Sequence, residues 1–183
     1  MVLILLLFAI LFQASPQTAL KPVIDNDRVA VWDVSDSAIA QPFDAVVVSL
    51  SGSAVFLPKG GRPKIAGRSM VIDLKDHPVP PIANTSGYPL AFPRPGSKKI
   101  FENARVVVWD YTWTPDVPTP MHFHDKDVVV VFLEDGDLKS TTPDGKDVIN
   151  SGKFGMVKFN LRDRTHKETL IRGKQHAIIT ELK

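Results

Sequence analysis

Hydrophobic residues along most of the chain occur in short runs rich in valine, and each run is followed by a turn signal. The runs at 44–50, 105–110 and 127–133 combine β-branched and aromatic residues, which is typical of β-strands. No convincing helical pattern accompanies them. The turn signals include Pro58-Lys59-Gly60-Gly61, Asp135-Gly136 and Pro143-Asp144-Gly145. The pattern predicts an all-β protein made of antiparallel sandwiches or barrels.

The first twelve residues, Met1 to Phe12, form one uninterrupted apolar run. As a helix this run would span about 18 Å, which is short of the roughly 30 Å hydrocarbon core but fits the apolar part of a secretory signal. No Lys or Arg precedes the run, and no clean small-x-small cleavage site follows it. Residues 1–20 are therefore expected to be either the signal peptide of an exported (periplasmic or secreted) protein or an N-terminal membrane anchor.

The two halves of the chain share a sequence pattern. Three segments recur in the same order, with offsets of 77, 83 and 86 residues, and the first pair is identical at five of six positions. The matched segments are 28–33 with 105–110, 44–50 with 127–133, and 70–71 with 156–157. This recurrence indicates an internal duplication, with one unit at 21–95 and a second at 96–183. The proline-rich stretch from Pro78 to Pro95 would finish the first unit and lead into the second.

Composition limits the partners and the chemistry. The chain has 22 Lys plus Arg against 20 Asp plus Glu, a net charge of +2, and this near-balance argues against a nucleic-acid partner. It contains no Cys, which excludes disulfides, thiolate nucleophiles and Cys-type zinc sites. Any metal site must use His, Asp or Glu side chains, and the sequence has five His.

Two of these histidines lie in a segment that the first unit lacks. Between the Trp-Asp pair and the Asp before the valine run, the second unit spans 17 residues and the first only 11. The extra segment contains His122 and His124, and residues two apart in a strand point to the same face. Neutral imidazole is a ligand for Fe, Zn, Ni or Cu, so this pair is a candidate for two ligands of one ion. The natural third ligand is His166, which follows the expected strand at 154–160.

At this point the second unit resembles a cupin domain. His122 and His124 match the His pair of the first cupin motif, with the turn at Asp135-Gly136 closing it, and Gly155 and His166 match the second motif at its spacing of eleven. The resemblance implies two tandem cupin-type jelly-roll β-barrels, with a metal site at 96–183. The first unit has Pro42-Phe43 where the His pair should lie, so residues 21–95 are expected to be a degenerate cupin without metal.

Departures from the motifs restrict the site to three ligands. The carboxylate ligand of the family would fall at Val128 or Val129, and it is missing. Asp127 lies one residue early and would face away, so it is interpreted as structural. Glu168 shares the strand parity of His166 and is a candidate ligand or general base, with an outward surface position as the alternative. His176, at the start of the closing strand, is a second candidate base, with a position at the rim as the alternative.

Other residues near the motifs are candidates for binding a ligand. Three cations bracket His166 and are candidates for attracting an anionic ligand, although solvated loop charges are the commoner case. These cations are Arg162, Arg164 and Lys167. Tyr111 and Trp113, in the extra segment, would line either the pocket mouth or an aromatic lid over the core. Because imidazole must be neutral to coordinate, metal affinity is expected to fall below about pH 6.5.

The sequence supports two classes of function. In the first, a divalent transition metal (Fe, Zn, Mn or Ni) on the three histidines serves an oxygenase or isomerase acting on a small organic molecule. In the second, the protein is a non-catalytic bicupin without metal, which binds a small ligand or pairs its sheets into a homodimer.

Overall fold

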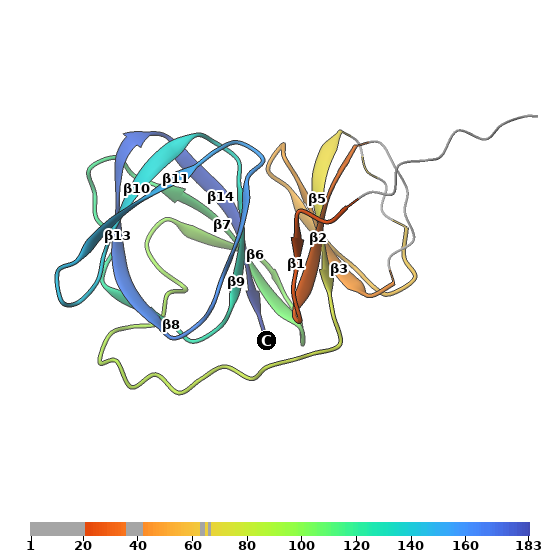
Figure 1. Ribbon diagram of the computed structural model, residues 1–183, viewed down its shortest axis with the longest axis horizontal. Helices are drawn as coiled ribbons and strands as arrows, with labels where there is room; N and C mark the ends of the chain where they lie inside the picture. Colours follow the sequence, from red (N-terminus) through yellow and green to blue (C-terminus); the bar gives the residue numbers. More distant parts are fainter. Residues whose placement is uncertain (1–20, 36–41, 63–64, 66) are drawn as a thin grey trace, which may run out of the picture.

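The computed structural model describes residues 21–35, 42–62, 65 and 67–183, and this part of the chain is built of β-strands (Figure 1). The all-β prediction is therefore confirmed. The expected signal peptide or anchor at 1–20 lies outside the described residues. Within the described ranges, no helix is long and apolar enough to span a membrane.

The first five strands form one antiparallel sheet, here called the N-terminal sheet. Its strand order is β1-β2-β5-β3-β4. The strands are β1 (Ile24–Asp25), β2 (Val29–Ser35), β3 (Asp44–Ser49), β4 (Ala54–Leu57) and β5 (Arg68–Leu74). The described N-terminal part thus contributes one sheet in place of a second closed barrel, because no strands in it cover the other face as a second layer.

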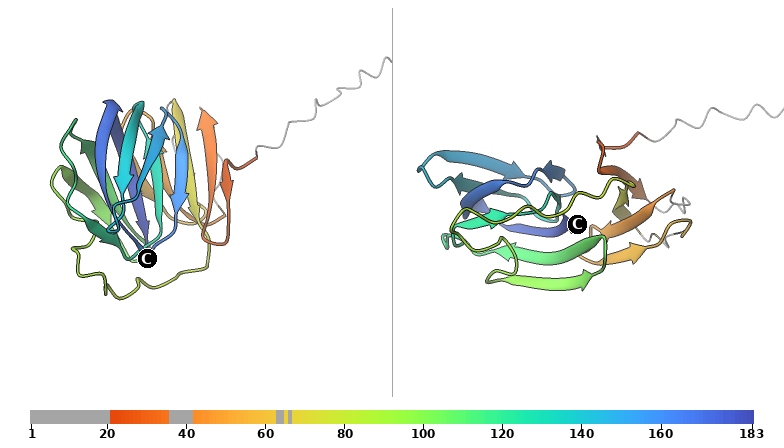
Figure 2. Two further views of the ribbon diagram at one scale, coloured as in Figure 1. Left: turned by 60° about the vertical axis from the view of Figure 1, so that its left-hand side comes forward. Right: turned by 90° about the horizontal axis from the view of Figure 1, so that it is seen from below.

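The remaining nine strands form a β-barrel of two sheets that face each other (Figure 2). The central sheet has the order β12-β9-β14-β7-β6, and the outer sheet has the order β11-β10-β13-β8. The strands are β6 (Ser97–Glu102), β7 (Val106–Trp113), β8 (His122–His124), β9 (Val128–Phe132), β10 (Gly136–Thr141), β11 (Asp147–Gly152), β12 (Val157–Asn160), β13 (Arg164–Gly173) and β14 (Gln175–Leu182). The extra segment seen in the sequence supplies β8, a strand of the outer sheet.

The N-terminal sheet and the central sheet have corresponding strand orders. β1-β2-β5-β3-β4 matches β6-β7-β14-β9-β12, and the register agrees too, since Val31 pairs with Ile72 where Val108 pairs with Thr180. The equivalent of β5 is therefore β14. The sequence match of 70–71 with 156–157 is wrong as a structural equivalence, because Met156 precedes β12 at the edge of the central sheet.

The polar contacts of the two sheets correspond as well. Arg28 pairs with Asp127 at 2.5 Å, and Arg105 pairs with Asp44 at 3.4 Å, so each unit donates an arginine to the aspartate of the other. Asp127 also accepts the backbone N–H of Arg162 at 2.8 Å, which confirms its structural role. Two contacts within the N-terminal sheet also have equivalents in the central sheet. The indole of Trp32 bonds to Asp73 as that of Trp109 bonds to Glu181, both at 2.8 Å. Arg68 contacts Asp33 as His176 contacts Asp110, both at 2.7 Å.

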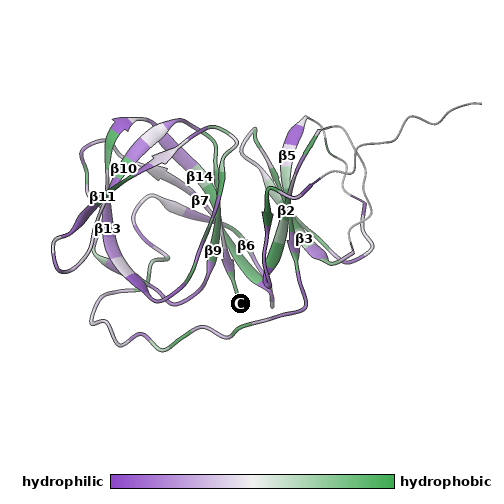
Figure 3. Cartoon of the chain, viewed as in Figure 1, coloured by the Kyte–Doolittle hydropathy of each residue, from purple (hydrophilic) through white to green (hydrophobic). Residues whose placement is uncertain are grey.

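Both faces of the central sheet are buried. One face packs on the N-terminal sheet, where Val129, Val131 and Ile178 meet valines of β2 and β3, and the other face lines the barrel, where Val128 and Val130 pack. A strand buried on both sides reads as a continuous hydrophobic run, which accounts for the valines at 128–131. Figure 3 shows hydrophobic residues concentrated where these two sheets meet.

A long extended segment, residues 75–96, connects β5 to β6 and is here called the strap. It runs beneath the molecule from the N-terminal sheet to the barrel (Figure 1). The N–H of Phe123 donates to the carbonyl of Pro89, and the N–H of Ala91 donates to the carbonyl of Phe123, both at 2.8 Å. Ala91 and Phe92 are part of the barrel core. Residues 89–94, which the sequence analysis assigned to the first unit, therefore pack with the second.

Replacing Asp127 by Asn is expected to lower the free energy of unfolding by about 3 kcal/mol, because it leaves the buried guanidinium of Arg28 without a charged partner. The matched change Asp44→Asn affects the more exposed equivalent pair and should cost about 1 kcal/mol or less. Urea unfolding of both variants measures the difference. Equal losses would contradict the idea that the Arg28–Asp127 pair is the tighter of the two.

Candidate metal centre

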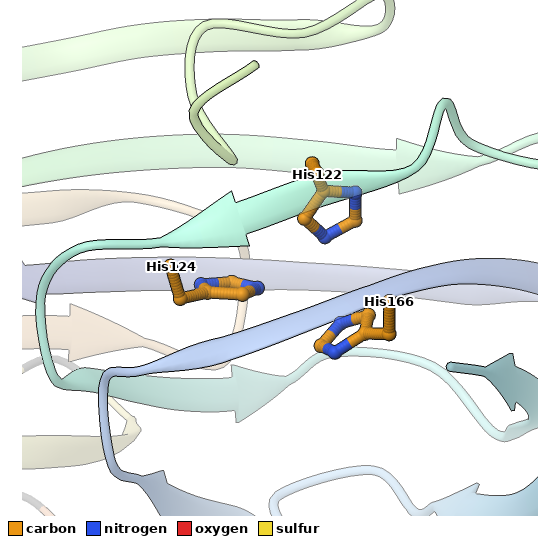
Figure 4. A group of neighbouring side chains, drawn as sticks. All are labelled: His122, His124 and His166. Atoms are coloured by element: carbon orange, nitrogen blue, oxygen red, sulfur yellow. The ribbon is translucent and has the colours of Figure 1, made fainter. Parts of the chain in front are cut away.

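Strand pairing brings the three predicted histidines together. β13 pairs with β8 so that His166 lies opposite His122 and Arg164 lies opposite His124. Side chains of facing and alternate residues share a face of the sheet. Figure 4 shows the three rings gathered on the same side of these two strands.

The three rings form a compact, buried cluster. Their centroids are 4.8 to 5.1 Å apart, and one ligand nitrogen of each ring lies within 4.8 Å of the others. The exposed fractions of His122, His124 and His166 are 1%, 6% and 8%. Two nitrogens bound to one ion at roughly 2.1 Å can be at most about 4.2 Å apart, so the rings need only a small inward movement. Nδ1 of His124 is buried without a partner among the described residues. The donor set fits a transition metal.

Burial keeps these imidazoles neutral. Desolvation, followed by the charge of Arg94, lowers the pKa of His122 from 6.5 to about 4. Burial likewise lowers the pKa of His166, and it lowers the pKa of His124 well below 6.5. A neutral ring offers a lone pair to a metal. The expectation that affinity falls below about pH 6.5 therefore shifts to lower pH.

Arg94, which the sequence analysis did not single out, enters the cluster from the strap. Nδ1 of His122 donates to the carbonyl of Pro120 at 2.8 Å, which leaves Nε2 as the acceptor, and Nη1 of Arg94 donates to this Nε2 at 2.9 Å. The guanidinium also lies over the ring of Tyr111, 4.1 Å from its centroid. The only sequence signal was an arginine between two prolines, two residues after Phe92.

Glu168 lies in the same network, inside the barrel. Its Oε2 accepts hydrogen bonds from Arg94 at 3.2 Å and from Nε1 of Trp113 at 3.0 Å, and its Oε1 lies 3.7 Å from Nε2 of His166. Burial would raise the pKa of Glu168, but the charge of Arg94 acts against burial, as does the hydrogen bond from Trp113, and the pKa is lowered. Glu168 is thus an ionised carboxylate beside the histidines.

His176 lies away from the three histidines. It has the same strand parity as Ile178, which packs toward the N-terminal sheet, whereas Ala177 and Ile179 face the barrel interior. Its Nε2 lies 2.7 Å from Oδ1 of Asp110. The structure therefore does not bring this candidate base to the cluster.

A cavity of about 520 Å³ opens beside the cluster, between the two sheets of the barrel. Its wall includes His124, His166, Glu168 and Trp113, so Trp113 of the extra segment faces the cavity. Of the three cations that bracket His166, Arg164 lines the cavity. Arg162 instead donates to the carbonyl of Pro80 in the strap. A volume of this size suits a small organic molecule.

Several solved structures are similar to this chain. No protein-family model and no curated protein matches the chain. Among solved structures, a cupin domain from Bordetella pertussis Tohama I is 26% identical, covering 50% of this chain and 97% of its own, with a TM-score of 0.44. A cupin 2 conserved barrel domain protein from Leptotrichia buccalis is 13% identical over 88% of this chain and 87% of its own, with a TM-score of 0.47. AerE from Microcystis aeruginosa is 8% identical over 90% of this chain and 97% of its own, with a TM-score of 0.53, and it shares the fold.

Fold and site together define the class of the second unit. It is a β-barrel of two facing sheets that buries three histidines, which could hold a metal ion.

The lowered pKa values predict how stability depends on pH in metal-free protein. The unfolded chain protonates His122 near pH 6.5 and the folded chain near pH 4, so the folded state binds fewer protons between these values. Stability should fall as the pH drops through this window, by roughly 3 kcal/mol for His122 alone. Thermal melts from pH 7 to 4 should show a shallower slope for His122→Gln, and identical slopes would contradict the assignment.

The contact between Arg94 and His122 predicts a competition with metal. Arg94→Met removes both the donor on Nε2 and a nearby positive charge, so zinc should bind at least tenfold more tightly, as measured against a chromophoric chelator. The matched control, Arg172→Met, changes an exposed arginine paired with Asp137 and should leave zinc affinity unchanged. Weaker zinc binding by a folded Arg94→Met protein would show that Arg94 supports the site.

Proposed function

We propose that the chain binds one divalent transition metal through His122, His124 and His166 and acts with it on a small organic molecule in the adjoining cavity. The observation that carries this proposal is the buried cluster of three neutral imidazoles whose nitrogens lie within 4.8 Å of one another. Nitrogen donors of this kind suit Fe, Zn, Ni and, with further oxygen ligands, Mn. A bound metal with open positions would supply Lewis-acid chemistry or oxygen activation, as in an isomerase or an oxygenase.

The residues around the histidines would prepare the site for such chemistry. Apolar side chains line part of the cavity, and apolar surroundings strengthen electrostatic interactions. Glu168 is ionised and lies 3.7 Å from His166, so it can orient this imidazole or accept a proton from a bound molecule. Arg94 holds Glu168 in place through Nη2, and its Nη1 would have to leave Nε2 of His122 when a metal binds there.

We also infer that the two units arose by internal duplication, with the first as a degenerate cupin that keeps one sheet. The matching strand orders and the reciprocal contacts of Arg28 and Arg105 support this origin. Export of the protein, or anchoring through residues 1–20, rests on the apolar run at the N-terminus.

A non-catalytic ligand-binding bicupin is the second candidate function. Two observations favour it. The carboxylate ligand of the cupin motif is replaced by valine. The guanidinium of Arg94 lies within hydrogen-bonding distance of Nε2 of His122. In this alternative the network of Arg94 and Glu168 is a structural element of the barrel, and the cavity holds its ligand without metal.

Metal content decides between the two functions. Purified protein loaded with zinc or with iron(II) is expected to retain one ion per chain after desalting, as measured by elemental analysis. The double variant His122→Ala, His124→Ala should lose this ion, whereas His176→Ala, which changes a histidine on the opposite face of β14, should keep it. A protein that retains no ion, or a double variant that binds as well as wild type, would exclude the metal-dependent function.

A further inference from the structure

The cavity beside the histidines carries two cations without carboxylate partners. Lys158 and Arg164 both line it, and neither forms an ion pair with a described residue. The carboxylate of Glu168 is already bonded to Arg94 and Trp113. Asp163, the other acidic lining residue, is exposed at the turn before β13. When Arg94 is counted with its partner Glu168, three cations and two carboxylates lie at the cavity, an excess of one positive charge.

Arg164 is held at the histidine end of this cavity. It lies opposite His124 in the pairing of β13 with β8, and its Nε donates to the carbonyl of Leu161. Its Nη2 is buried and has no partner among the described residues. Burial lowers the pKa of this guanidinium. A buried donor without a partner is costly, and a ligand anion that reached this guanidinium would satisfy it.

Much of the lining of the cavity is apolar. This apolar part comes from side chains of the central sheet, across the barrel from Arg164, and from one leucine of β10 in the outer sheet. These residues are Val128, Val130, Phe132, Leu138 and Ile179. Lys158 extends along this apolar lining, with its Nζ 5.7 Å from the ring centroid of Phe132. Because one side is hydrophobic and two cations lack counter-ions, the cavity matches a molecule with an apolar body and one anionic group.

We propose that the ligand of this cavity is an amphipathic organic acid, whose carboxylate pairs with Arg164 and Lys158 and whose apolar body lies against the valines of β9. This inference rests on the proposed function, because it takes the cavity beside the three histidines as the substrate site. It names the class of substrate that this site accepts. A carboxylate at Arg164 is also placed beside His124, and therefore next to the candidate metal centre.

The test uses three probes that share one apolar body, namely 4-phenylbutyrate, 4-phenylbutyramide and 4-phenylbutylamine. Their affinities are measured by isothermal titration calorimetry on full-length protein stripped of metal. The carboxylate is expected to bind at least tenfold more tightly than the amide, and the ammonium probe is expected to bind most weakly. Equal affinity for the carboxylate and the amide would overturn the proposal.

Two variants locate the contact. Arg164→Gln and Lys158→Gln should each weaken binding of 4-phenylbutyrate by about tenfold or more and leave binding of the amide nearly unchanged. Lys158→Gln keeps the test decisive if Arg164→Gln does not fold. The matched control is Lys146→Gln, which removes the same charge from an exposed turn outside the cavity and should have no effect. If this control also loses carboxylate binding, the weaker binding is caused by the change in net charge and not by a contact in the cavity, and the proposal is overturned.

Zinc titration of the same proteins separates this inference from the metal proposal. If zinc binds and the carboxylate shows no preference, the substrate class is wrong and the metal centre stands. If the carboxylate binds metal-free protein through Arg164 and zinc does not bind, the metal centre is wrong and the cavity still recognises an organic acid.

Discussion

The packing of the N-terminal sheet against the central sheet of the barrel is the contact on which the rest of the structure depends. It buries the outward face of β9 and β14 under the valines of β2 and β3. A barrel of this kind could not leave such a face exposed, because contiguous apolar surface drives association. With that face covered by the chain's own first unit, the inward face is available to form the cavity. The Arg28–Asp127 and Arg105–Asp44 pairs then set how the two sheets meet.

The site itself is a balance of buried charge. Glu168 and Arg94 are both removed from water inside or at the wall of the barrel, and each is tolerable only because the other is present. Trp113 donates a further hydrogen bond to the carboxylate, and the guanidinium lies over the ring of Tyr111. The neutral histidines sit next to this pair without adding charge. The strap thus serves the site as well as connecting the units, because it delivers Arg94.

The sequence predicted the strands and the pair of His122 and His124 because both depend on local periodicity, whereas His166 was joined to the pair through the resemblance to the second cupin motif. Valine runs mark buried strands, and the two-residue spacing of His122 and His124 places them on one face whatever the tertiary structure. Arg94 could not be predicted, since its partners lie 28 and 74 residues away and proline-rich segments carry no periodicity. The equivalence of β5 with β14 was missed for a similar reason. The two strands share register and contacts but little sequence. Residues 156–157 resemble 70–71 more closely in sequence, so sequence alone matched the wrong segment to β5.

Charge also links the two proposals for the site. A divalent ion on the three histidines would lie close to the guanidiniums of Arg94 and Arg164, and this repulsion opposes metal binding. An organic anion on Arg164 would offset that repulsion, and the ion in turn would attract the anion. Because coupling between two ligands is reciprocal, each would strengthen the binding of the other by the same factor. A site made of three neutral histidines would in this way gain negative charge from its own substrate.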